Sequence, residues 1–317
     1  MSKFLLLIYK ILSVIFLPIV IVIVFFRIFQ NKEINTRIKE RFAFSSVKRP
    51  KGNLIWINAS SIGEYLATVS LIKKIRKIKP KIKILLTTNT KTSALLAQKI
   101  TNKNIFHQFT PQDNPLIIKK FLNYWKPSLV IWMESEFWPI ILNETKKYGI
   151  KIILLNGRMS DKSFRNWSFF KFFFKEITSN FSLILTMSKI DKENFKKLGT
   201  KNVNFIGNLK FSNKELQYDQ ELEKKAKKII GNRHVWLAAS THHGEEIFAT
   251  RIHLKLKKKL NLKNLLTIIV PRNIKRTSKI KKSINSYVPL TELFQSKSIS
   301  RNTEIIIDDS IGQLEIW

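Results

Sequence analysis

The chain has 317 residues, 44% of them hydrophobic, and carries 57 Lys and Arg against 22 Asp and Glu. Its length fits two ordinary domains or one large one, and its apolar content excludes intrinsic disorder as the default state. The absence of cysteine excludes disulfides, thiolate metal sites and cysteine nucleophiles. A net charge of +35 attracts anionic partners, but the lysines are scattered rather than gathered in one arm. We therefore expect an anionic surface, and no nucleic acid, as a partner.

The first 30 residues have the composition of a membrane element. The segment Phe4–Phe29 is apolar apart from Lys10, Ser13, Pro18 and Arg27. About 20 apolar residues suffice for a membrane-spanning helix if Lys10 extends toward the interface. Basic residues follow the segment and favour a cytoplasmic location for the downstream chain: Arg27, Lys32, Arg37, Lys39 and Arg41. We expect residues 1–30 to form a single anchor that spans the membrane, or alternatively a helix that lies in its interface.

A series of short apolar runs follows Gly52 and predicts strands at Asn53–Asn58, Ile82–Thr87, Ser128–Trp132, Ile150–Leu155, Leu183–Thr186 and Val203–Ile206. Between them lie segments with helical spacing, such as Glu64–Ile78, Lys91–Ile100 and Asp191–Leu198. Apolar strands that alternate with helices predict an α/β fold with a mostly parallel sheet covered on both faces.

A second series begins after the polar stretch Asn208–Gln217. Its predicted elements are a helix near Asp219–Ile230, a strand at His234–Ala239, a helix at Gly244–Leu260, and strands at Leu265–Val270 and Glu304–Ile307. Two such series predict two Rossmann-like domains, residues 31–212 and 213–317. Ligands of open α/β sheets bind beyond the carboxyl ends of the strands, so the residues after each apolar run are candidates for the site.

The first of these candidates is the segment Asn58–Glu64. Gly63 permits close approach of the backbone, and free amides at a helix start suit an anionic ligand. Glu64 can act as a general base toward a hydroxyl group. The alternative is that Ser60 or Ser61 caps the helix and Glu64 only balances the helix dipole. Local features alone favour this alternative.

Further candidates follow the later strands. Glu134 and Glu136 stand beside bulky aromatic residues, which predicts raised pKa values or a cation site, although Glu136 can also be an ordinary residue of a first helical turn. Arg158 can meet a phosphate or carboxylate, or be a plain surface residue. Lys210 lies at the expected domain junction and is either a site residue or a solvated linker lysine.

In the second series, the segment Ser240–Glu246 repeats the strand–turn–helix arrangement and suits phosphate or ribose contacts. The adjacent His242 and His243 cannot easily face one metal ion together. Arg272 ends another strand and adds a cation at the same sheet edge. Motifs of dinucleotide binding, P-loops, nucleophile elbows and zinc proteases are absent from the sequence, which disfavours redox chemistry and nucleotide hydrolysis.

Eight motifs, taken in order, closely resemble those of the bacterial 3-deoxy-D-manno-octulosonic acid (Kdo) transferases: ASSIGE, TTNTKTS, PQDNP, ESEFWP, NGRMS, GNLKF, AASTHHGEE and VPR. They extend from about Arg37 to the carboxyl terminus, and the apolar amino terminus also fits that family. The resemblance implies a GT-B glycosyltransferase at the cytoplasmic face of the inner membrane. It implies CMP-Kdo as donor, a lipid A precursor (lipid IVA) as acceptor, and inversion without a metal or another cofactor.

The resemblance also implies roles for single residues. Glu64 is the expected base, and Glu136 and Lys210 are expected to stabilise the transition state. The expected contacts to the CMP of the donor are Ser240, Thr241, Pro271, Arg272, Ile311, Gly312 and Gln313. The expected contacts to the acceptor are Ser60, Ser61, Gly63 and Arg158.

The end of the chain departs from the family pattern. The family usually continues with a Gly-rich turn and an Asn-Pro-Leu-Glu stretch that hold CMP, whereas this sequence ends at Ile311–Trp317. That end resembles a Met-Gly-Glu-Leu motif with Gln313 in the usual acidic place. We therefore expect an incomplete second domain. The alternative function is an inactive membrane module of the same family that binds only the lipid acceptor or a partner.

Overall fold

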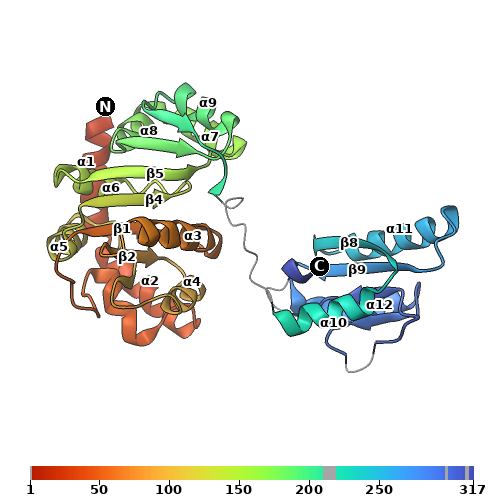
Figure 1. Ribbon diagram of the computed structural model, residues 1–317. Helices are drawn as coiled ribbons and strands as arrows, with labels where there is room; N and C mark the ends of the chain where they lie inside the picture. Colours follow the sequence, from red (N-terminus) through yellow and green to blue (C-terminus); the bar gives the residue numbers. More distant parts are fainter. Residues whose placement is uncertain (1, 210–218, 297–298, 311–313) are drawn as a thin grey trace. The chain divides into compact units, whose positions relative to one another are not determined.

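A computed structural model describes residues 2–209, 219–296, 299–310 and 314–317. The chain divides into two compact units, Met1–Lys214 and Glu215–Trp317. Each unit contains its own parallel β-sheet with helices packed on it (Figure 1). The two sheets confirm the α/β fold that alternating apolar and helical segments predict.

The first unit contains a seven-stranded sheet with the order β3-β2-β1-β4-β5-β6-β7. Every neighbouring pair in it is parallel. Its strands are β1 Leu54–Asn58, β2 Lys83–Thr88, β3 Ile105–Phe109, β4 Leu129–Met133, β5 Lys151–Gly157, β6 Leu183–Thr186 and β7 Val203–Phe205. Its helices after the amino-terminal pair are α3 Ile62–Ile78, α4 Lys91–Gln98, α5 Pro115–Trp125, α6 Pro139–Lys147, α7 Asp161–Phe169, α8 Lys171–Thr178 and α9 Lys189–Lys197, and a 3₁₀ helix spans Asn35–Phe42.

Both faces of this sheet are buried. Along β1, Leu54 and Trp56 belong to a core beneath α5, α6 and α8, whereas Ile57 belongs to a second core beneath α3 and α4. This alternation is the period of two that a strand imposes on its side chains. Burial on both faces explains why the strands appear in the sequence as continuous apolar runs.

The second unit contains a four-stranded parallel sheet with the order β10-β11-β9-β8. Its strands are β8 His234–Thr241, β9 Leu265–Pro271, β10 Thr291–Leu293 and β11 Ile305–Ile307. Its helices are α10 Gln220–Ile230, α11 Glu245–Lys259 and α12 Thr277–Asn285, with short 3₁₀ helices at Ile274–Arg276 and Leu314–Ile316. The elements predicted after residue 219 all appear in the predicted order, and the structure adds α12 and β10, which the sequence did not predict.

The amino terminus forms two helices, α1 Ser2–Ile15 and α2 Leu17–Phe29, bent by 59° at the break between them. Pro18 lies in the first turn of α2, where its missing N–H is tolerated best. Within the described part of the chain, no single helix is long and apolar enough to cross a membrane, while this bent pair passes the same test when its two helices are taken together. The sequence predicts one helix here, and the structure has two.

Helix α1 packs against the rest of the first unit through polar contacts as well as apolar ones. Lys10 Nζ donates to Glu144 Oε1 at 2.6 Å and to Asn143 Oδ1 at 2.7 Å, both on α6. Asn114 Nδ2 donates to the carbonyl oxygen of Ser13 at 2.9 Å. Lys10 therefore does not extend freely toward an interface, as the interpretation of a spanning helix assumed, because a buried carboxylate holds its ammonium group.

Candidate active site

The turn between β1 and α3 fixes the side chain of Glu64. Glu64 Oε2 accepts the backbone N–H of Ser60 at 2.7 Å, and Glu64 Oε1 accepts the hydroxyl of Ser61 at 3.1 Å. Ser61 is the N-cap of α3, and its hydroxyl also accepts the backbone N–H of Glu64. Cap and carboxylate therefore support each other, as in a capping box. The carboxylate is held in one orientation and is buried, with Glu64 only 6% exposed.

Burial raises the pKa of Glu64 to about 7. The negative charges of Glu134 and Glu136 contribute to this rise, whereas the N–H of Ser60 opposes it by favouring the charged form. A carboxyl group with a pKa near neutral pH can take up a proton and release it again under ordinary conditions. This property is what general base catalysis requires of a carboxylate.

The loop after β4 places two further carboxylates at the end of a strand beside β1. Glu134 has a left-handed backbone with φ 55°, and its Oε1 accepts Asn156 Nδ2 at 3.4 Å. Glu136 Oε2 accepts the indole N–H of Trp138 at 2.5 Å. Among the described residues, no group of three or more His, Cys, Asp or Glu side chains is arranged to hold a metal ion.

A chain of hydrogen bonds connects this turn to residues that the sequence analysis did not assign to the site. Asn89, which follows β2, donates from Nδ2 to Ser60 Oγ at 3.0 Å. Arg41 Nη2 donates to the carbonyl oxygen of Asn89 at 2.5 Å. Arg41 in turn forms an ion pair with Glu33 at 3.0 Å. Asn89 lies within the TTNTKTS motif, so a motif pointed to this segment, but only the fold shows that it contacts Ser60.

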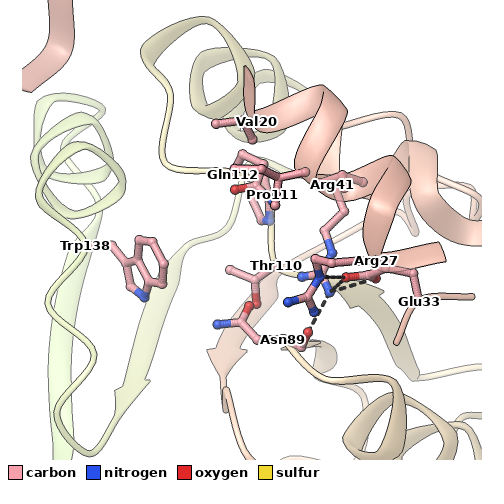
Figure 2. Close-up of a pocket in the computed structure, with 11 residues that line it drawn as sticks. Val20, Arg27, Glu33, Arg41, Asn89, Thr110, Pro111, Gln112 and Trp138 are labelled. Carbon is pink, nitrogen blue, oxygen red and sulfur yellow. Dashed lines mark hydrogen bonds and ion pairs between the residues drawn. The ribbon is translucent and has the colours of Figure 1, made fainter. Parts of the chain in front are cut away.

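A cavity of about 370 Å³ lies between α2 and the loops after β2 and β3 (Figure 2). Figure 2 shows the indole of Trp138 on one side of the cavity and the ion-paired cluster of Arg27, Glu33 and Arg41 on the other. Asn89 and Thr110 also line this cavity. The cavity therefore shares residues with the hydrogen-bond chain that reaches Ser60.

The expected acceptor contacts are only partly together in the structure. Ser60, Ser61 and Gly63 lie in one turn with Glu64. Arg158 follows β5, its side chain is exposed, and its carbonyl oxygen accepts the hydroxyl of Ser135. Lys210 lies outside the described residues.

In the second unit, the expected donor contacts lie at the ends of the adjacent strands β8 and β9. Thr241 pairs with Pro271 in the sheet, and the backbone N–H of Arg272 donates to the carbonyl oxygen of Thr241 at 3.0 Å. Ser240 has a φ of 58° and marks an irregularity in the pairing. The backbones of these four residues are therefore together at one sheet edge. Ile311, Gly312 and Gln313 lie outside the described residues.

Residues 36–213, more than half of the chain, match the family model described as 3-deoxy-D-manno-octulosonic-acid transferase (kdotransferase). The chain belongs to this family. The matched range includes Glu64, Glu136 and Lys210 and ends before the residues expected to contact the donor. The match therefore concerns the first unit, where the carboxylates lie.

Relatives of the Kdo transferase family align beyond this range. A 3-deoxy-D-manno-octulosonic acid transferase of Rickettsia bellii is 39% identical over 272 residues, which are 86% of this chain and 64% of that protein. One of Rickettsia typhi is 33% identical and aligns with 98% of this chain and 76% of its own length. The chain thus spans about two thirds to three quarters of the length of these relatives.

Solved structures show the same fold at low sequence identity. A complex of S. aureus MnaA with UDP has a TM-score of 0.55 at 10% identity and covers 83% of this chain and 70% of that one. A glycosyltransferase of Rickettsia africae has a TM-score of 0.54 at 12% identity, with the same two coverages. These similarities support a GT-B-like α/β fold for this chain.

Proposed function

We propose that this chain transfers Kdo from CMP-Kdo to a lipid A precursor (lipid IVA), with inversion and without a metal ion or other cofactor. The observation that carries the proposal is Glu64, whose buried carboxyl lies at the end of β1 with a pKa raised to about 7. Membership of the Kdo transferase family supports the choice of substrates, which are a sugar nucleotide and a hydroxyl group of a lipid.

In the proposed reaction, Glu64 removes the proton from the acceptor hydroxyl while the oxygen of that hydroxyl attacks the anomeric carbon of Kdo. The bond from that carbon to the phosphate of CMP breaks, and CMP leaves with the bonding electrons. Glu136 and Lys210 stabilise the transition state, and Lys210 and Arg272 offset the charge of the leaving phosphate. These side chains neutralise the leaving phosphate, as a divalent metal ion does in metal-dependent enzymes.

The two substrates contact different units in this proposal. Ser60, Ser61, Gly63 and Arg158 contact the acceptor near the base. The residues that hold the CMP of the donor are Ser240, Thr241, Pro271, Arg272, Ile311, Gly312 and Gln313. The adjacent ends of β8 and β9 support this assignment, because ligands of open parallel sheets bind at such an edge.

The proposed location is the anionic cytoplasmic face of the inner membrane. Helices α1 and α2 expose many large apolar side chains, among them Phe25, Phe26 and Phe29, the last 84% exposed. Helix α1 packs against α8, and the junction of α7 with α8 exposes Phe169 and Phe172 as well. An exposed apolar surface of this kind is typical of a protein that inserts into the membrane interface.

The test is transfer of labelled Kdo from CMP-Kdo to tetra-acylated lipid IVA by the full chain and by Glu64→Gln. We expect the variant to lose about 10²–10⁴-fold in rate, the usual contribution of a general base. Glu193→Gln, which removes an exposed carboxylate on α9, is the matched control and should retain the rate. A Glu64→Gln protein that keeps full activity would refute the assignment of the base.

Inactivity of the unaltered chain has two possible meanings, which a graft separates. If a carboxyl-terminal segment of a longer relative restores transfer, the chain alone is an inactive module of the same enzyme family. If the grafted protein is folded, shown by circular dichroism, and still inert, the proposed donor or acceptor is wrong.

A further inference from the structure

Two cavities adjoin beneath the bent helix pair of the first unit. The first, described above, has a volume of about 370 Å³, and the second has about 340 Å³. Val20, Gln112 and Trp138 line both of them. The two cavities therefore form neighbouring compartments of one groove between α1, α2 and the loop after β3.

The second compartment is lined mainly by the apolar side chains around the helix break. Leu12, Phe16 and Leu17 line it from the helices, and Trp138 lines it from the facing loop. Polar residues line it too, Asp113 among them, but the Asp113 carboxyl already accepts the N–H groups of Ile140 and Ile141. The compartment is therefore suited to a hydrocarbon chain, since burial of apolar surface is the favourable term available there.

The first compartment has a cationic end. Arg27 and Arg41 both donate to Glu33, at 2.8 Å and 3.0 Å, so two guanidinium groups share a single carboxylate. Arg41 is only 5% exposed, and its Nε is buried without a hydrogen-bond partner in the described part of the chain. This end therefore retains positive charge and an unused donor, which suit an anionic group such as a phosphate.

The cationic end lies close to the proposed base. Asn89 lines the first compartment and donates to Ser60 Oγ, and the backbone N–H of Ser60 donates to Glu64. The order along the groove is thus hydrocarbon compartment, arginine pair, and the turn that holds Glu64. A ligand that fits this order has an acyl chain at one end and an anionic sugar head at the other.

We propose that the groove beneath the bent helix pair binds one acyl chain of the phosphorylated glycolipid acceptor, with a phosphate of its head group at Arg27 and Arg41. The proposal rests on the proposed function and adds that the protein draws one chain of the lipid out of the bilayer. The helix pair then has two faces: an outer face toward the membrane and an inner face toward the acceptor.

The first test is photo-labelling of the full chain in detergent micelles, without CMP-Kdo. The probe is a diphosphorylated, tetra-acylated glucosamine disaccharide that carries a diazirine in one acyl chain. We expect peptide mapping to place its cross-links at Leu12, Phe16 and Trp138. Cross-links confined to Phe25, Phe29 and Phe169 on the outside would overturn the proposal. Equal labelling of the groove by a diazirine phosphatidylglycerol would assign it to bulk lipid and overturn the proposal as well.

The second test narrows the groove. Val20→Trp should raise the KM for the tetra-acylated acceptor about tenfold or more, because several methylene groups lose their buried site. Its KM for a fully deacylated, phosphorylated acceptor should not change. Ile19→Trp, which alters an exposed neighbour outside the groove, is the matched control and should change neither value. An equal effect of both variants, or of Val20→Trp on both acceptors, would overturn the proposal.

The outcomes distinguish a wrong lipid site from a wrong proposed function. Labelling needs no transfer, so groove-specific cross-links in a folded chain that stays inert even after the carboxyl-terminal graft would support the lipid site and refute the reaction. Transfer that depends on Glu64, together with cross-links outside the groove, would support the reaction and refute the lipid site.

Discussion

The Glu64 carboxyl is subject to opposing influences. Burial and the charges of Glu134 and Glu136 favour its protonated form, while the backbone N–H of Ser60 favours the carboxylate. The first influences dominate, so the pKa is about 7 rather than the ordinary 4.5. A base of this strength accepts a proton more readily than an ordinary glutamate and is still half deprotonated at neutral pH.

The pH dependence of kcat/KM tests this balance. Because the base must be deprotonated, we expect kcat/KM for Kdo transfer to rise as the pH rises through about 7. Glu134→Gln removes one negative neighbour, lowers the pKa of Glu64 and should move this rise to lower pH. Glu193→Gln, remote on the surface of α9, should leave the midpoint in place. A midpoint near 4.5 in the unaltered chain would contradict the raised pKa.

The sequence identified Glu64 but could not decide whether its carboxylate is a general base or only stabilises the start of a helix. The structure shows why, since the same carboxylate accepts the N–H of Ser60 and also packs at the start of α3. Its burial and the nearness of Glu134 depend on neighbouring strands that the sequence does not place side by side. Asn89 was missed for the same reason, because its contact with Ser60 joins the loops after two different strands.

At the scale of elements, helix α6 takes its cap from another loop. Its N-cap residue, Trp138, makes no capping hydrogen bond with its side chain. Asp113 supplies the acceptors instead, and takes the N–H groups of Ile141 at 2.7 Å and Ile140 at 3.2 Å. Asp113 also bonds to Tyr9 of α1, so one carboxyl connects α1, the loop after β3 and α6.

Asp113→Ala should therefore lower the free energy of unfolding by about 1–2 kcal/mol, as loss of a helix cap does. Asp113→Asn should cost less, because its amide oxygen still accepts one N–H. Urea titration measures both, with Asp161→Ala, at the exposed first turn of α7, as the control. Equal stability of Asp113→Ala and Asp161→Ala would contradict the capping role.

The stability of this contact should also depend on pH. Burial, foremost, raises the pKa of Asp113 from 3.8 to about 6. Between about pH 4 and pH 6 the folded chain therefore binds this proton more tightly than the unfolded chain. The free energy of unfolding should fall as the pH rises through this window, and urea titrations of Asp113→Asn should show a smaller fall. An equal fall in variant and unaltered chain would contradict the raised pKa.

Most strands of the seven-stranded sheet were predictable because its inner strands are buried on both faces, so apolar runs coincide with β1, β2 and β4 to β6. The edge strand β7 also coincides with a predicted run, although only Val203 in it is buried. Strand β3 was missed, because its sequence contains His107 and Gln108. Both are buried in satisfied contacts: Arg37 Nη2 lies 2.9 Å from His107 Nδ1, and Trp125 Nε1 donates to Gln108 Oε1 at 3.0 Å. Partners that are distant in sequence make these polar residues acceptable in a strand, and composition does not reveal them.

At the scale of the whole chain, the net charge of +35 and the exposed apolar helix pair favour the same kind of partner. Basic side chains on α7 and α8 are exposed beside Phe169 and Phe172: Lys162, Arg165, Lys171 and Lys175. Each basic group near an anionic bilayer contributes about 1 kcal/mol, and apolar side chains add their own transfer free energy. Aromatic and basic groups side by side therefore predict binding at an anionic interface.

Flotation with lipid vesicles tests this surface. We expect the chain to bind vesicles with phosphatidylglycerol more tightly than neutral ones, and added salt should weaken this binding because it screens the exposed charges. The double variant Phe169→Ser and Phe172→Ser should weaken binding about tenfold or more, since two large apolar groups lose their place in the interface. Phe248→Ser removes an equally apolar, 65% exposed side chain from the second unit and should have no such effect. Equal losses in both variants would mean that general hydrophobicity, rather than the surface formed by α1, α7 and α8, holds the protein on the lipid.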